Sequence, residues 1–167
     1  MLNKILQWLL IFALQVVVFN HLDFSSYLVP QVFILILITL PLHLSKINQI
    51  LIAFGIGLLA DMFVSTPGIH ASACLSLIVL RMFLFSRLDL KEQQSNRMFF
   101  NVKNVGISMF FYSAIILVVF YHLYVFGLES IGAINWVSLL LTTLFSSTLS
   151  LLAIGSIQYI SYGRQSE

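Results

Sequence analysis

Charge is scarce in this sequence. Asp, Glu, Lys and Arg together make up 8% of its 167 residues, whereas 60% are hydrophobic. The mean hydropathy is +1.02, and no polar segment is long enough to form the surface of a soluble domain. This composition excludes a soluble catalytic domain and predicts an integral membrane protein. The net charge is only +2, and nothing indicates a nucleic-acid partner.

Cysteine is also nearly absent. The single Cys74 cannot form an intrachain disulfide, and we interpret it as a small packing residue. His21, His43 and His122 occur singly near the ends of apolar runs, without the ligand spacing of a metal site. No Ser or Cys has a plausible base, and no HExxH motif or pair of Asp residues indicates an intramembrane protease. We therefore expect a protein that is not an enzyme, with no catalytic residue, metal or cofactor.

Long apolar runs make up most of the chain. Short polar segments, or segments with Pro and Gly, separate them, and each run is near the length of about 20 residues that crosses a bilayer. We predict an all-α integral membrane protein in which residues 1–167 form a single transmembrane domain, a compact six-helix bundle. The six crossings are expected at residues 4–19, 29–44, 47–64, 69–88, 105–126 and 136–159.

Two stretches leave alternatives open. The first run follows Lys4 and resembles a signal peptide, but the next residues, FNHLDF, lack a small-x-small cleavage site, so we interpret it as an uncleaved crossing. The one hydrophilic stretch, SRLDLKEQQSNRMFFNVKN at residues 86–104, is expected to be a cytoplasmic loop or an interfacial helix. The alternative to six crossings is five, with the first run lost or one short crossing re-entrant.

The basic residues predict the orientation, because cytoplasmic segments of membrane proteins accumulate Lys and Arg. With both termini in the cytoplasm, the connections at 20–28, 65–68 and 127–135 face outward, and they contain neither Lys nor Arg. Arg81 then lies in the cytoplasmic half of its crossing, and lipid headgroups are expected contacts of the basic side. The other basic residues all fall on the cytoplasmic side: Lys4, Lys46, Arg87, Lys91, Arg97, Lys103 and Arg164.

One acid interrupts the apolar stretch GIGLLADMFVSTPGIHASA, residues 55–73. Gly57 and Asp61 are four residues apart and share one helix face with Ala53 and Ala60, where small residues let another helix approach closely. A carboxylate exposed to hydrocarbon would cost about 2.5 to 3.5 kcal/mol, so we expect Asp61 to face protein.

The role of Asp61 has two interpretations. In the structural one, it fixes the turn that contains Pro67 and Gly68, by hydrogen bonds with the backbone N–H groups and hydroxyls of that segment. In the functional one, it is a proton or cation site, or a polar contact for a partner protein. His70 follows the turn and is expected to be a structural or interfacial residue that bonds Asp61 or the turn.

Two further sets of polar residues lie within the predicted crossings. Arg81 is about 16 Å along its helix from His70, too far for an easy bridge to Asp61. It either snorkels toward the cytoplasm or pairs inside the bundle or with a carboxylate of a partner. The last crossing carries many hydroxyls, which we assign to helix packing, with a polar groove as the alternative. These hydroxyls are Ser138, Thr142, Thr143, Ser146, Ser147, Thr148 and Ser150.

The residues around Asp61 resemble a known bacterial family. Residues 54–81, FGIGLLADMFVSTPGIHASACLSLIVLR, resemble the signature region of the rod shape-determining protein MreD: a small-residue helix, an Asp, a short turn with Gly, and a helix that opens with His and Ala. Residues 27–45, YLVPQVFILILITLPLHLS, are similar to the family's second region, in which proline precedes a long apolar run. The resemblance covers residues 27–88 and is diffuse toward the C-terminus.

The positions that match the family motif are Gly57, Asp61, Gly68 and His70. Pro67 stands where the family is more variable, and Arg81 has no assigned role in it. The resemblance implies a non-enzymatic component of the bacterial inner membrane that binds MreC and helps organise side-wall peptidoglycan synthesis and cell shape. Its indirect partners would be the MreB filament, RodA and a class B penicillin-binding protein.

The family is also similar in fold to the substrate-binding subunits of energy-coupling-factor vitamin transporters, which are six-helix bundles with a pocket near the outer face. A small-molecule-binding subunit of such a transporter is therefore the alternative function. Its discriminating feature would be a polar pocket near Asp61, His70 and the outer loops.

Overall fold

The computed structural model describes residues 2–18, 28–88, 99–132 and 135–163, and the side chains it describes lie within residues 6–161. Every regular element in these ranges is an α-helix, which confirms the all-helical expectation for them. The helices are α1 (Leu2–Val17), α2 (Ile34–Ile38), α3 (Lys46–Val64), α4 (Ile69–Arg87), α6 (Val102–Val105), α7 (Ile107–Glu129) and α8 (Trp136–Gly163).

Four helices, α3, α4, α7 and α8, are each long and apolar enough to cross a membrane. The apolar part of α1, Leu6–Val17, is shorter. The outer faces of the long helices carry exposed apolar side chains such as Leu51, Phe63 and Leu144. So large an exposed apolar surface is unfavourable in water and favourable in hydrocarbon. The fold is therefore that of a membrane protein, in which four of the six predicted helices reach membrane-spanning length.

The predicted helical crossing at residues 29–44 is wrong. Only Ile34–Ile38 of this segment is helical, and turns or irregular backbone make up the rest. Pro30 and Pro41 bracket the short helix, and proline cannot continue the hydrogen-bond pattern of a helix interior. Every residue from 30 to 42 is buried, so this segment, here called the inner segment (residues 28–44), is enclosed by the long helices instead of facing lipid.

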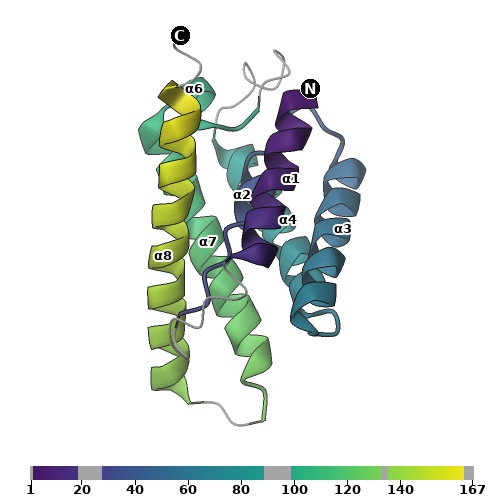
Figure 1. Cartoon of the computed structure of the whole chain (residues 1–167), viewed down its shortest axis with the longest axis vertical. Helices are drawn as coiled ribbons and strands as arrows, with labels where there is room; N and C mark the ends of the chain where they lie inside the picture. Colours follow the sequence, from purple (N-terminus) through teal and green to yellow (C-terminus); the bar gives the residue numbers. More distant parts are fainter. Residues whose placement is uncertain (1, 19–27, 89–98, 133–134, 164–167) are drawn as a thin grey trace.

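The long helices form a chain of neighbours in which α3 packs on α4, α4 on α7, and α7 on α8. In Figure 1 the start of α1, the start of α3, the end of α4, α6 and the end of α8 all lie at one end of the bundle. The turn between α3 and α4 lies at the opposite end. The two ends of the described chain are thus on the same side of the fold.

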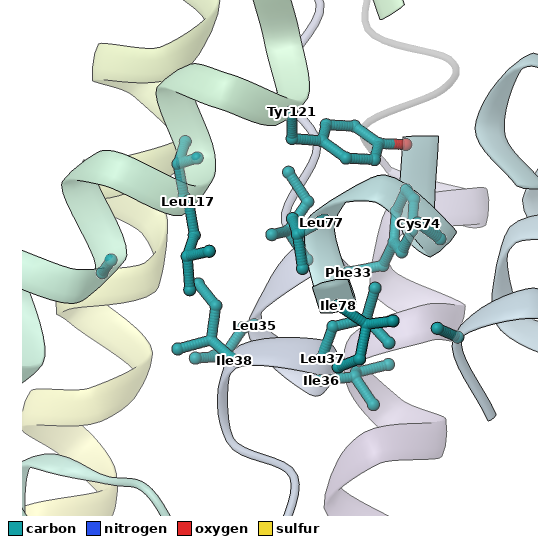
Figure 2. Packing of buried hydrophobic residues seen from close by; sticks show 14 of the residues in the cluster. Phe33, Leu35, Ile36, Leu37, Ile38, Cys74, Leu77, Ile78, Leu117 and Tyr121 are labelled. Carbon is teal, nitrogen blue, oxygen red and sulfur yellow. The ribbon is translucent and has the colours of Figure 1, made fainter. Parts of the chain in front are cut away.

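The apolar core is built around the inner segment. Its fully buried side chains include Phe33, Leu37 and Ile38, and they belong to one cluster with Leu77 of α4 and Leu117 of α7. Figure 2 shows α2 between α4 and α7, with the side chains of α2 packed against those of the two longer helices. A helix that is apolar on all sides belongs in a protein core or in lipid, and here the surrounding helices cover the apolar run of residues 32–38.

The hydrophilic stretch predicted at residues 86–104 lies mainly outside the described residues, which resume at Phe99. The part that is described contains α6, whose start is capped by Asn101: the backbone N–H of Asn104 donates to its side-chain oxygen at 3.0 Å. Gly106, at φ +85°, then redirects the chain into α7.

Candidate functional site

The carboxylate of Asp61 ties the end of α3 to the start of α4. Its Oδ1 accepts hydrogen bonds from the hydroxyl of Thr66 at 2.8 Å and from the backbone N–H of His70 at 2.9 Å. Its Oδ2 accepts from the backbone N–H of Ala71 at 2.9 Å. The first N–H groups of a helix have no partner within the helix, and the positive end of the helix dipole favours an anion there. Asp61 thus caps α4 from the preceding helix, which agrees with its structural interpretation.

The turn itself requires two unusual backbone conformations. Ser65, which ends α3, has φ +59°, and Gly68, which precedes α4, has φ +83°. Glycine adopts positive φ without steric cost, whereas serine adopts it less readily. Pro67 lies between them in the exposed part of the turn. The predicted motif residues therefore form one compact joint of Asp61, Pro67, Gly68 and His70.

Gly57 brings the two helices of this joint into backbone contact. A Cβ atom placed on Gly57 would lie 2.5 Å from the Cα of Ala71 and 2.8 Å from the carbonyl oxygen of His70. Ala53, Ala60 and Asp61 on the same face of α3 are buried as well. The predicted stripe of small residues is thus the face by which α3 packs on α4.

We expect replacement of Asp61 by alanine to lower the free energy of unfolding by about 2 kcal/mol, because loss of a helix cap costs about 0.5 to 2 kcal/mol and the hydroxyl of Thr66 loses its acceptor too. Thr66→Val removes one of the three bonds and should cost less than half as much. The measurement is the temperature at which Cys74, the one cysteine of the sequence and a buried one, becomes reactive to a thiol dye in detergent. Equal costs for the two variants would contradict the capping role.

The ring of His70 lies inside the bundle, beside α7. Its Nδ1 lies 2.6 Å from the hydroxyl of Tyr121 on α7, and both residues are almost fully buried. Phe33 of the inner segment packs edge-on against both rings. His70 therefore contacts α3 through its backbone, and α7 and the inner segment through its ring.

Arg81 does not snorkel, contrary to one of the two expectations for it. Its side chain is 1% exposed, and it bonds the backbone of the inner segment. Its Nη2 donates to the carbonyl oxygen of Leu40 at 2.7 Å and its Nε to that of Ile38 at 3.3 Å. Its Nη1 donates to the side-chain oxygen of Gln49 at 2.7 Å. The expected pairing inside the bundle does occur, but with neutral oxygens instead of a carboxylate.

Side chains from α1 and α8 bond the other end of the inner segment. The amide of Gln15 donates to the carbonyl oxygen of Pro30 at 3.0 Å and accepts from the N–H of Val32 at 2.6 Å. The hydroxyl of Ser146 accepts from the N–H of Val29, and that of Ser150 from the N–H of Gln31. Backbone that is not helical must find hydrogen-bond partners where no water is present. The serines expected to pack helices therefore satisfy the backbone of the inner segment.

Several of these residues have no counterpart in the sequence prediction. Gln15, Gln49 and Tyr121 have no predicted role, although Gln15 stands alone in an apolar run, the same signal that marks Asp61. His122 is fully buried inside α7 and lies 3.3 Å from the hydroxyl of Ser150, instead of near a helix end.

The predicted site residues form two groups in the folded protein. Gly57, Asp61, Gly68 and His70 meet at one end of the bundle, whereas Arg81 lies 11 residues further along α4, about 16 Å away. Among the residues that the structure describes, no three His, Cys, Asp or Glu side chains come close enough to hold a metal ion.

Two pockets with both polar and apolar linings open at opposite ends of the bundle. One, of about 210 Å³, lies beside Arg81 and is lined also by Lys46, Gln49 and Ser86. The other, of about 260 Å³, is lined by Glu129 and Asn135 together with residues of α8 such as Ser138 and Thr142.

The chain was compared with protein-family models, with curated proteins and with solved structures, and none of them matches it.

Proposed function

We propose that the protein is a non-enzymatic component of the bacterial cell-elongation complex, of the MreD type. In this role it would bind MreC and help organise side-wall peptidoglycan synthesis. The support from sequence is the resemblance of residues 54–81, and the four positions that match the motif lie at the single joint between α3 and α4.

The observation that carries the proposal is the use of the polar groups inside the bundle. Gln15, Arg81, Ser146 and Ser150 all bond the backbone of the inner segment, and Asp61 bonds the start of α4. The polar atoms that make these particular hydrogen bonds are not available to a substrate. Recognition is then left to apolar helix faces and short connections, as a scaffold requires.

The proposed topology is a multi-pass protein of the bacterial inner membrane with both termini in the cytoplasm. It is supported by the placement of Lys46, Arg87 and Lys103, which lie at the same end of the bundle as the start of α1 and the end of α8. The opposite end carries the two described acids, Asp61 and Glu129. This separation of charge fits the rule that basic residues stay inside.

A transporter subunit that binds a small molecule is the second candidate, and the pocket beside Glu129 favours it. This pocket lies at the end proposed to face outward, and Asn135, Ser138 and Thr142 add polar groups to its lining. Asp61 and His70 do not line it, in contrast to the pocket expected for this alternative. Retention of a vitamin by the purified full chain would favour the transporter over the scaffold.

The test of the scaffold is co-purification of MreC with the full-length chain from membranes that contain both. We expect MreC to be retained by the wild type and by folded Asp61→Asn, because the side chain at position 61 points into the turn. Cells that carry the variant should keep their rod shape. A multi-pass protein of similar size serves as the control. Failure of the wild type to retain MreC would contradict the proposal. If folded Asp61→Asn alone failed to retain MreC, Asp61 would belong to the contact with the partner.

A further inference from the structure

The pocket beside Arg81 combines positive charge with an apolar lining. Arg81 and Gln49 line its buried part, and the exposed Lys46 and Ser86 line its open part. The apolar side chains around it come from the end of the inner segment and from α4: Leu42, Leu44, Met82 and Phe85.

The positive charge of Arg81 is not neutralised by any described residue. Its three acceptors are two backbone carbonyls and an amide, all neutral, and the ring of Phe85 lies 4.5 Å from its guanidinium carbon. A guanidinium has five N–H donors, so one N–H on each of Nη1 and Nη2 has no acceptor within the described part of the chain. A buried cation is costly unless an anion accompanies it.

The acids that the structure describes cannot supply that anion. Asp61 and Glu129 both lie at the other end of the bundle, and Asp61 is already bonded to the start of α4. The charges near the pocket are instead positive. Lys46 is the first residue of α3, so the positive end of this helix dipole also lies here.

We propose that this pocket binds a phosphate group carried by an anionic phospholipid. A guanidinium with two spare N–H groups fits two oxygens of a phosphate, and an ammonium group beside it adds a second favourable charge. The apolar residues at the pocket favour a phosphate with lipid chains attached over a free ion. The site does not depend on the proposed scaffold function, since it would serve any protein with this fold in an anionic leaflet.

The experiment is a titration of the detergent-purified full-length protein with dioleoyl phosphatidylglycerol, read by native mass spectrometry. Dioleoyl phosphatidylcholine, with the same chains and no net charge, is the matched lipid. We expect the anionic lipid to bind more tightly to the wild type. Lys46→Gln should weaken its binding about fivefold, and Ser86→Trp should weaken it at least as much by filling the pocket without changing the charge.

Arg87→Gln is the control variant, because it removes one positive charge at the same end but Arg87 does not line the pocket and stacks on Phe83 instead. Its lipid binding should stay within about twofold of the wild type, because a surface charge outside the site contributes little. Millimolar inorganic phosphate at constant ionic strength should not displace the lipid.

Three results would overturn the proposal. Equal binding of the two lipids by the wild type would mean that the pocket does not select an anionic headgroup. Unchanged binding in Lys46→Gln and Ser86→Trp would place the lipid elsewhere. Displacement by phosphate would identify the ligand as a free anion instead of a lipid.

Discussion

Replacement of Gly57 by alanine should lower the free energy of unfolding by about 1 to 3 kcal/mol, the usual cost of forcing extra atoms into a packed interface. The new methyl group would meet the Cα and N of Ala71 and the carbonyl oxygen of His70, all at less than 3 Å. These are backbone atoms, which cannot turn aside as a side chain can. The helices must therefore separate, and the hydrogen bonds of Asp61 to the start of α4 would lengthen.

Gly55 provides the matched control in the same helix. A Cβ atom at Gly55 meets nothing within 4 Å, so Gly55→Ala should be neutral or stabilise by up to about 1 kcal/mol, as expected where alanine replaces glycine in a helix interior. Thiol labelling of Cys74 during heating measures both variants. Equal unfolding temperatures for Gly57→Ala and Gly55→Ala would show that the two helices can part without cost.

Replacement of Arg81 by leucine should destabilise the fold by about 3 kcal/mol. The carbonyl oxygens of Ile38 and Leu40 would lose their donors while remaining buried, and each such loss costs about 1 to 3 kcal/mol. The removal of a buried cation offsets part of this cost. Arg81→Lys keeps the charge but not the fork of donors, so it should fall between leucine and the wild type.

The same thiol assay checks this expectation, with Arg87→Gln as the comparison. Arg87 is exposed, and its replacement should change the free energy of unfolding by no more than about 0.5 kcal/mol. A wild-type unfolding temperature for Arg81→Leu would mean that the hydrogen bonds of Arg81 are not needed to hold the inner segment.

Hydropathy was sufficient to predict the four long helices. The crossings predicted at 47–64 and 69–88 correspond closely to α3 and α4, because Ser45, Pro67 and Gly68 mark their ends. It failed at residues 29–44 because an apolar run has the same composition whether lipid or protein surrounds it. The two prolines were the signal that this run could not be one continuous helix.

Side-chain roles were predictable where the partner was local in sequence. The turn after Asp61 offers N–H groups and hydroxyls within ten residues, so a structural bond there could be foreseen. Arg81 differs because its partners are carbonyl oxygens about 40 residues away, and backbone acceptors have no signature in a sequence. The lone amide Gln15 could have been recognised by the cost of an unpaired amide in hydrocarbon.

The dependence of the inner segment on Ser146 and Ser150 has a consequence for biosynthesis. These two serines belong to α8, which is synthesised more than 100 residues after the backbone groups that they bond. Until then the N–H groups of Val29 and Gln31 lack these partners, and hydrocarbon offers no substitute. During synthesis these backbone groups must therefore stay in contact with water or the insertion machinery, and burial of the segment is completed only after α8 has been translated.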